Sequence, residues 1–310
     1  MEQTSGFLNI NKPTNHTSHD IVAILRKSLD IKKIGHSGTL DPFATGVLIV
    51  GINEATKLFE YLPSDKAYLA EITFGIETDT DDITGKIIKK QNDIPTLNEI
   101  TKKLESFKGK IKQTPPIYSA VKINGKRAYS LARKNNISLE DLKEKEVEIY
   151  SIEIISYDLT GKSIKLKIHC SSGTYIRSIA RDLGKSLNSC AVLSSLKRIK
   201  IGDFFSLEQS IDPKSLTKSN FLTYLIPPSK VISLEQIHLE QPQISDIFHG
   251  KSVKINEDQL RSTIVACCSK PPLQILDNNN DLIAIGTLTN NCIIKPKKVF
   301  LKNAEPTSIK

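Results

Sequence analysis

The strongest constraint on the fold of this chain is a period-two alternation of apolar and polar residues in two separate segments. In residues 163–170, SIKLKIHC, the apolar Ile164, Leu166 and Ile168 alternate with lysines. Residues 67–76, AYLAEITFGI, alternate in the same way but less cleanly. Successive side chains of a strand point to opposite faces of a sheet, so both segments predict strands with one buried and one wetter face.

Two other segments carry a helical pattern. Apolar residues recur on one face of residues 16–29, HTSHDIVAILRKSL, where Thr17 or Ser18 would be the N-cap. A second helix is predicted in residues 174–187, TYIRSIARDLGKSL, directly after the strand and its Ser and Gly breakers. Arg177 stands near the start of this helix, where a positive charge opposes the helix macrodipole. An arginine in that position indicates that it serves an anion.

The length of 310 residues allows one large domain with a small satellite, or two ordinary domains. The pattern loosens after residue 205, and IPPSK at 226–230 is typical of a linker. Beyond it, short apolar runs joined by polar turns predict a small β-rich module, with DNNND at 277–281 as a hairpin turn. The predicted strands lie in residues 247–255, 260–268, 273–288 and 292–301.

Composition restricts the partners and the compartment. The net charge of +9 and the pI near 9.1 favour a polyanion such as nucleic acid or a membrane surface, although the scattered basic residues also fit an ordinary lysine-rich protein. Five cysteines without CxxC spacing predict reduced thiols and no structural metal. The first residues lack a signal-peptide pattern and no run has the length of a membrane span. We therefore expect a soluble cytoplasmic protein with no membrane partner.

Residues 34–50, IGHSGTLDPFATGVLIV, are richer in polar groups than a turn requires. His36 and two hydroxyl residues lie near Asp41 between three glycines, and an apolar run follows. Pro42 keeps Asp41 out of a helix interior. The loop matches neither GxGxxG nor the P-loop, and a lone carboxylate does not fit a glycosidase with two carboxylates. Asp41 is therefore a candidate nucleophile or general base, with a turn-capping aspartate as the structural alternative.

Several ordered segments resemble the TruB family of tRNA pseudouridine synthases. They are GHSGTLDPFATGVLIV followed by EATKL, SDKAYLAEITFGIETDTDDITG, QTPPIYSAVKINGKRAYSLAR, CSSGTYIRSIARDLG and LKRIKIGDF. The resemblance spans about residues 6–205, and the tail from about 243 resembles a PUA-like RNA-binding module more weakly. It implies an α+β fold, in which a pseudouridine synthase catalytic domain with a mixed or antiparallel sheet covers residues 1–230 and a small β-rich PUA-like domain covers 231–310.

The resemblance also implies the reaction, which is isomerisation of uridine to pseudouridine at uridine-55 in the T loop of tRNA. Asp41 corresponds to the nucleophile of the family and would act on a flipped-out uridine. It would attack either the ribose C1′ or the uracil C6, and the sequence leaves both routes open. The implied enzyme is an isomerase that needs no cofactor or metal. Its implied partner is the T arm of tRNA, and we expect a monomer.

Four further residues correspond to substrate-binding residues of the family. The resemblance assigns Tyr68 to stacking on the bound base and His36 to packing against the nucleotide. It brings Tyr175 and Arg177 into the pocket, where Arg177 would form a bidentate ion pair with Asp41 and hold it ionised.

Two further residues are open to a second interpretation. Leu196 would line the base pocket or belong to the core, and Lys57 would contact RNA phosphate, pair with a carboxylate such as Asp82, or remain solvated. The family usually has glycine where this chain has Asn15 and Asn53. Asparagine tolerates a left-handed backbone, so we expect both turns to survive.

Two alternatives to this function remain open. One is a noncatalytic tRNA-binding chaperone of the same fold, which would share the charge and the aromatic residues. Such a binder has no need of a carboxylate at Asp41, where it would repel phosphate. The other is a pseudouridine synthase that acts on ribosomal RNA or within a guide-RNA complex.

Overall fold

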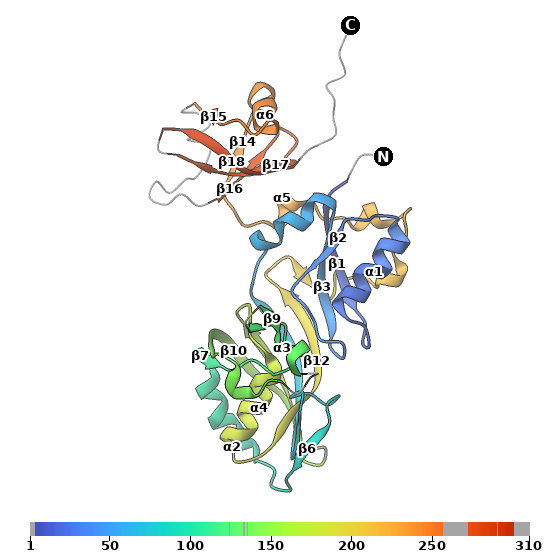
Figure 1. The fold of residues 1–310 in the computed structure, drawn as a ribbon, viewed down its shortest axis with the longest axis vertical. Coiled ribbons are helices and arrows are strands. Elements are labelled where there is room, and N and C mark those ends of the chain that lie inside the picture. The colour runs from blue at the N-terminus through green and yellow to red at the C-terminus, as the bar shows by residue number, and fades with distance from the viewer. Residues whose placement is uncertain are drawn as a thin grey trace.

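A computed structural model describes residues 4–123, 125–132, 134, 136–256, 272–289 and 291–300. A nine-stranded sheet runs through the N-terminal two thirds of the chain, and a five-stranded sheet forms the C-terminal part (Figure 1). The large sheet contains β1 (Gly6–Lys12), β2 (Ile34–Ser37), β3 (Thr45–Ile52), β4 (Lys66–Phe74), β7 (Gly109–Gln113), β10 (Lys145–Asp158), β11 (Ser163–Cys170), β12 (Ala191–Ile201) and β13 (Phe205–Ser206). The predicted strands at 67–76 and 163–170 are β4 and β11, although β4 ends at Phe74.

The large sheet is mixed, as expected for the α+β class. Its strand order is β1-β3-β12-β4-β11-β10-β7, with β2 on β3 and β13 on β12. The β3–β12 pair is parallel, with Arg198 opposite Gly46, and the other pairs described for this sheet are antiparallel. Gly46 has a φ of 101°, and a Cβ on it would lie 2.2 Å from the carbonyl oxygen of Arg198. This close approach joins the two halves of the sheet.

Gly46→Ala is expected to lower the free energy of unfolding by at least ~2 kcal/mol, because it adds backbone strain and a steric clash. Gly109→Ala is the matched control, since Gly109 also has a positive φ of 80° but has no atom within 4 Å of its would-be Cβ. It should cost only the strain, about 1 kcal/mol. Urea denaturation of both variants measures the difference, and equal losses would show that the contact with Arg198 does not matter for stability.

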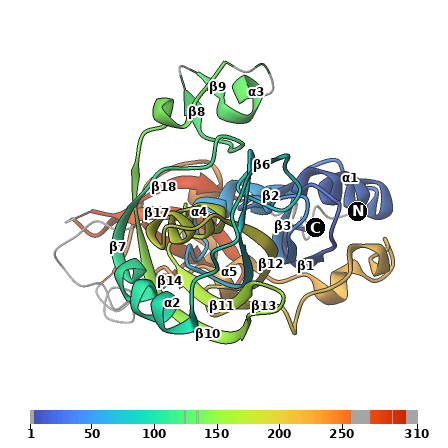
Figure 2. The same cartoon turned by 90° about the horizontal axis from the view of Figure 1, so that it is seen from below.

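Helices and 3₁₀ turns connect many of these strands. The helices are α1 (Ser18–Leu29), α2 (Leu97–Leu104), α3 (Ala128–Ala132), α4 (Ile176–Ser186), α5 (Pro228–Val231) and α6 (Gln241–Phe248), with 3₁₀ turns η1 (Asn53–Tyr61), η2 (Glu105–Phe107), η3 (Leu139–Asp141), η4 (Pro213–Ser215) and η5 (Phe221–Tyr224). Thr17 caps α1 through a capping box with Asp20, which confirms one of the two predicted N-caps. Separate two-stranded sheets are formed by β5 (Ile76–Thr78) with β6 (Ile87–Lys90), and by β8 (Lys122–Ile123) with β9 (Lys126–Arg127). Figure 2 shows β8, β9 and α3 projecting from the body.

Apolar packing places the helices on the sheet. The helix α4 and the strands β4 and β11 share one core cluster, while α1 packs with residues of β1 and β3 in another. On β11, Ile164, Leu166 and Ile168 are fully buried, and Lys165 and Lys167 reach the other face. The alternation in the sequence therefore identified which face of the strand is buried.

The C-terminal sheet has the order β14-β16-β17-β18-β15. Its strands are β14 (Gln236–His238), β15 (Val253–Lys254), β16 (Pro272–Leu276), β17 (Leu282–Leu288) and β18 (Ile293–Val299), and the predicted turn at 277–281 joins β16 to β17. The strand prediction was wrong at Ile247 and Phe248, which end α6. A proline near the start of α6 and a capping box between Glu240 and Gln243 favour the helix. The predicted strand at 260–268 lies outside the described residues.

The C-terminal sheet shares a buried apolar cluster with the N-terminal part of the chain, largely at η1 and α5. Ile285 and Phe300 belong to the same buried cluster as Phe7 and Leu58. Lys298 also forms an ion pair with Glu60. The helix α5 crosses the predicted boundary between residues 230 and 231.

Two local expectations concern the backbone and the thiols. Asn15 and Asn53 have φ of 61° and 50°, so asparagine does adopt the left-handed backbone at both turns. Cys170, Cys190 and Cys292 are free thiols, whereas Cys267 and Cys268 lie outside the described residues. Within the described ranges, no His, Cys, Asp and Glu side chains gather as a metal site would require. Among those same residues, no helix is long and apolar enough to cross a membrane.

Candidate active site

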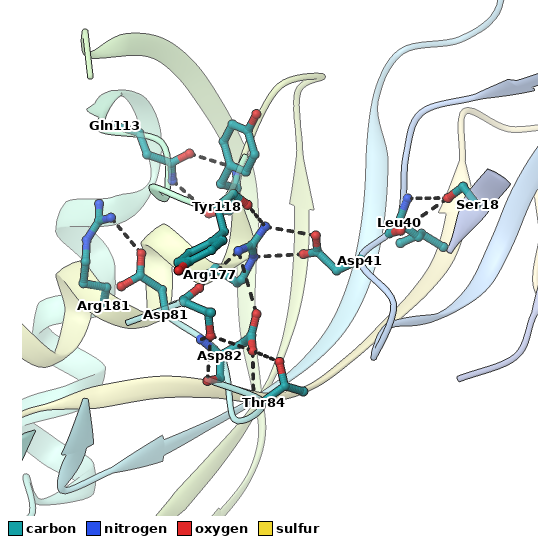
Figure 3. A network of polar contacts seen from close by, with 12 residues as sticks. Ser18, Leu40, Asp41, Asp81, Asp82, Thr84, Gln113, Tyr118, Arg177 and Arg181 are labelled. Atoms are coloured by element: carbon teal, nitrogen blue, oxygen red, sulfur yellow. Dashed lines mark hydrogen bonds and ion pairs between the residues drawn. The ribbon is translucent and has the colours of Figure 1, made fainter. Parts of the chain in front are cut away.

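The loop between β2 and β3 holds Asp41 at its centre, and buried groups fix its backbone. The hydroxyl of Ser18 on α1 accepts a hydrogen bond from the Leu40 amide at 2.9 Å and donates to the Leu40 carbonyl oxygen at 3.3 Å (Figure 3). The Lys12 ammonium donates to the Pro42 carbonyl oxygen at 3.3 Å. The residues on both sides of Asp41 are therefore held by side chains from β1 and α1.

Arg177, in the first turn of α4, faces Asp41. Its Nη2 donates a hydrogen bond to Asp41 Oδ1 at 2.9 Å, and its Nε lies 2.9 Å from Asp41 Oδ2 (Figure 3). The Nε contact is an ion pair without the alignment of a hydrogen bond. The Arg177 side chain is 5% exposed, whereas that of Asp41 is 31% exposed. The expected two-point ion pair is present, and its carboxylate is the member that solvent can reach.

Asp82 holds Arg177 from the other side. Its Oδ2 lies 3.7 Å from Arg177 Nη1. Its Oδ1 accepts hydrogen bonds from the Thr84 amide at 3.0 Å, the Thr84 hydroxyl at 2.6 Å and the Thr80 hydroxyl at 2.9 Å. Arg177 also donates to the carbonyl oxygens of Thr80 and Tyr118, each at 3.1 Å. A buried guanidinium with this many acceptors has one stable orientation.

Burial and charge act in opposite directions on Asp41. Burial raises the pKa of the Asp41 carboxyl above its ordinary value, and Arg177 acts to lower that pKa. The negative charge of Asp82 raises the pKa of Asp41 further. Arg177 is therefore the main group that favours the charged, nucleophilic form of this partly exposed carboxylate.

The structure places Tyr68 and Leu196 in the same apolar cluster as Leu40, next to the Asp41 loop. Tyr68 is on β4 and is 6% exposed, and Leu196 is on the adjacent β12 and is 7% exposed. Leu196 therefore belongs to the core, in the same cluster as Tyr68. Whether Leu196 also lines the pocket for a bound base is not tested by this burial.

His36 is on β2, five residues before Asp41, and is partly buried. Burial lowers the pKa of its imidazole, and the nearby His19 and Arg198 lower it further. Its Nδ1 is buried without a hydrogen-bond partner among the described residues. His36 is therefore a neutral ring at neutral pH.

Tyr175 is the residue before α4, and Gln113 fixes its backbone. The Tyr175 amide donates to Gln113 Oε1 at 2.8 Å, and Gln113 Nε2 donates to the Tyr175 carbonyl oxygen at 3.1 Å. Burial raises the pKa of the Tyr175 phenol, while the nearby Arg177 acts to lower it and Asp41 to raise it. Tyr175 is thus held beside the ion pair, two residues before Arg177.

Lys57 does not join this group. It lies on η1, and its Nζ is 2.5 Å from Glu54 Oε2, with a side chain that is 49% exposed. The suggested pairing with Asp82 was wrong, because Asp82 pairs with Arg177. Residues at i and i+3 are neighbours on a helical turn, which explains why Lys57 pairs with Glu54 instead.

Several residues of this network were absent from the predicted site. Asp82 and the threonines beside it lie in TDTDDITG, a segment that the sequence analysis matched to the family but did not connect to Arg177. Arg181 on α4 pairs with Asp81 at 2.9 Å in the same segment. The spacing of Arg177 and Arg181, one helical turn apart, and of Asp81 and Asp82 was the available signal. No local pattern pointed to Gln113.

Two solved structures share the fold of this chain. A chain of a solved Cbf5-Nop10-Gar1 complex superposes with a TM-score of 0.71 at 24% identity, covering 96% of this chain and 85% of that one. A solved archaeal box H/ACA Nop10-Cbf5 complex gives 0.68 at 21% identity, covering 96% of this chain and 86% of that one. At these identities the likeness is one of fold.

Sequence similarity then gives the family. The family described as TruB family pseudouridylate synthase (N terminal domain) matches residues 26–176. A tRNA pseudouridine synthase B of Borreliella afzelii is 45% identical over 81% of this chain and 87% of its own length. One of Prochlorococcus marinus is 41% identical over 95% of this chain and 97% of its own. The chain belongs to the TruB family of pseudouridylate synthases.

Proposed function

We propose that this chain isomerises uridine to pseudouridine in tRNA, at uridine-55 of the T loop, with Asp41 as the nucleophile. The observation that carries the proposal is the Asp41–Arg177 pair, in which a buried arginine keeps a partly exposed carboxylate charged. The relatives are named as tRNA enzymes, which supports tRNA as the substrate class. The positive net charge of +9 also suits a polyanionic substrate.

The chemistry moves one bond within a nucleotide. Asp41 attacks either the ribose C1′ or the uracil C6 and forms a covalent bond there, the bond between C1′ and the base nitrogen breaks, and the base turns so that C5 bonds to C1′. The bond to Asp41 then breaks as well, which restores the free carboxylate. The proton on C5 is then lost, while the released nitrogen gains one. Because substrate and product have the same atoms and oxidation level, the proposal needs no cofactor.

The remaining residues would bind the flipped nucleotide. Tyr68 stacks on the base and Leu196 contacts its edge, while the neutral His36 and Tyr175 border the ribose and base. Lys57, exposed on η1, would contact RNA only outside the Asp41 pocket, after exchanging Glu54 for a phosphate. We assign these roles as part of the proposal, together with a catalytic domain at residues 1–230 and a PUA-like RNA-binding domain at 231–310.

The rest of the proposal concerns the protein in the cell. It acts as a monomer in the cytoplasm and binds the T arm of tRNA. The noncatalytic chaperone is the second candidate function, and it differs in one testable respect. A chaperone would keep its activity without the Asp41 carboxylate, because binding to RNA gains nothing from a negative charge.

Tyr68 supplies a prediction about base stacking. Tyr68→Phe keeps the ring and should bind the RNA almost normally, whereas Tyr68→Ala should lose about 1–3 kcal/mol of binding free energy. Filter binding or fluorescence titration with a T-arm hairpin measures both. Equal affinity for the native protein and the two variants would remove Tyr68 from the stacking role.

The proposed function is tested by tritium release. A T-arm hairpin carrying [5-³H]uridine at the T-loop position loses its label only if a new bond forms at C5. Native protein without added metal or nucleotide should release the tritium to completion, and a hairpin labelled only at a stem uridine should retain it. Tight binding of the hairpin with no release would favour the chaperone.

A further inference from the structure

Arg198, on β12, is a buried cation that the proposed chemistry does not use. Its side chain is 1% exposed and is among the largest fully buried side chains of the protein. Within the described part of the chain, no carboxylate forms a salt bridge with it. Its Nε donates to the Val47 carbonyl oxygen at 2.7 Å, and its Nη2 donates to the Gly38 carbonyl oxygen at 2.9 Å. A buried arginine that donates to the carbonyl groups of two segments holds those segments together.

The two carbonyl groups belong to opposite ends of one loop. Gly38 directly follows β2 and Val47 is the third residue of β3, so the loop between them contains Asp41. The backbone of Arg198 touches the same loop, since it pairs with Gly46, where there is no room for a Cβ. One residue of β12 therefore fixes both ends of the segment that carries the nucleophile.

Arg198 also stands beside the proposed stacking residue. It is directly opposite Tyr68 in the register between β12 and β4. Burial raises the pKa of the Tyr68 phenol, and the charge of Arg198 and its hydrogen bond to that side chain act in the other direction. Arg198 thus contacts the Asp41 loop directly and lies opposite Tyr68 in the sheet, so it stands between the two parts that must keep a fixed spacing.

We propose that Arg198 is a positioning residue that sets the distance between the Asp41 carboxylate and the Tyr68 ring by tying both ends of the Asp41 loop to β12. The effect of Arg198 on catalysis rests on the proposed function. The clamp itself, meaning the attachment of both ends of the Asp41 loop to β12, rests on the contacts of Arg198 alone. The planar fork of arginine reaches two acceptors at once, whereas the single ammonium of lysine does not reproduce that geometry.

The test compares Arg198→Lys and Arg198→Met with a matched control, Arg26→Lys. Arg26 also donates to a backbone carbonyl, that of Ile34 at 2.7 Å, but it lies on α1 outside the Asp41 loop. Three quantities are measured for each protein, namely amide hydrogen exchange in the peptide 38–47, the single-turnover rate of pseudouridine formation on a saturating tRNA transcript, and the affinity for that transcript. Thermal unfolding identifies any variant that fails to fold.

We expect Arg198→Lys to exchange faster in 38–47 than the native protein, with other peptides unchanged, and to lose about 100-fold in single-turnover rate, as a displacement near 1 Å would cause. Affinity should change less than threefold, and Arg198→Met should lose more rate than Arg198→Lys. Native exchange and rate in a folded Arg198→Lys would overturn the proposal. An unfolded Arg198→Met leaves Arg198→Lys as the deciding variant.

The exchange measurement separates this inference from the proposed function. If the native protein forms no pseudouridine but Arg198→Lys loosens 38–47, the proposed function fails and the clamp stands. If the native protein is active and Arg198→Lys matches it in both rate and exchange, the clamp fails and the proposed function stands. A loss of rate with unchanged exchange would also overturn the clamp, because the effect would then arise elsewhere.

Discussion

Asp41→Asn is expected to lower the single-turnover rate of pseudouridine formation by at least ~10⁴-fold, as the removal of a nucleophile does in other enzymes. The amide has the same shape as the carboxylate but carries no charge, so it cannot form the covalent bond. Affinity for tRNA should be equal or slightly higher, because a negative charge is removed from a surface that binds a polyanion. Rapid-quench kinetics and equilibrium titration with the same transcript give the two values.

Asp81→Asn is the matched control for that experiment. Asp81 is also a largely buried aspartate paired with an arginine of α4, namely Arg181 at 2.9 Å, but it makes no contact with Asp41 in the described structure. Its rate should fall far less, by about tenfold at most, through indirect effects on the neighbouring Asp82. A rate for Asp41→Asn that matches the rate for Asp81→Asn would contradict the assignment of Asp41 as nucleophile.

Arg177→Met is expected to have the second largest effect, a loss of about 10²–10³-fold in rate at neutral pH, because the charge that stabilises the partly exposed Asp41 carboxylate is removed. Breaking this buried pair should also lower the free energy of unfolding by about 3–5 kcal/mol. With Arg177 gone, burial and Asp82 both raise the pKa of Asp41, and only the weaker effect of Lys12 opposes them. The acid limb of the pH–rate profile should therefore move to higher pH, and the loss of rate should shrink as the pH rises.

The stability of Arg177→Met should change with pH in the opposite direction to its rate, falling as the pH rises. A carboxyl whose folded pKa lies above its unfolded value binds more protons in the folded state, so stability falls as pH rises through that interval. Arg177→Met should therefore lose stability, relative to the native protein, as the pH rises above the ordinary carboxyl range. Arg177→Lys, which keeps the charge, should show a smaller shift of the acid limb. An unchanged acid limb in Arg177→Met would refute the electrostatic role of Arg177.

The spacing of apolar residues along the sequence predicted helices and strands correctly where only one face of the element is buried. The strand β11 and the helix α1 were predictable because each has a clear apolar face that follows its own period. The end of α6 was not, since Ile247 and Phe248 are too short an apolar run to distinguish helix from strand. There the N-terminal proline and capping box decided the structure.

The candidate site was predictable in part for a similar reason. Asp41 and Arg177 stand out locally, one before a proline and the other at a helix start, although 136 positions separate them. The partners of Arg177 and Arg198 are mainly backbone carbonyl groups and a distant Asp82, and carbonyl groups have no signature in a sequence. Lys57 shows the converse, because a lysine within a matched segment proved to pair locally with Glu54.

The most direct test of the account is to map pseudouridine along a full-length unmodified tRNA transcript after incubation with native protein, with no metal or nucleotide added. Mass spectrometry of the digested product locates each modified position. The account predicts one pseudouridine, at the T-loop uridine, and none in a transcript in which cytidine replaces that uridine. Tight binding without product, or product only at other positions, would contradict it.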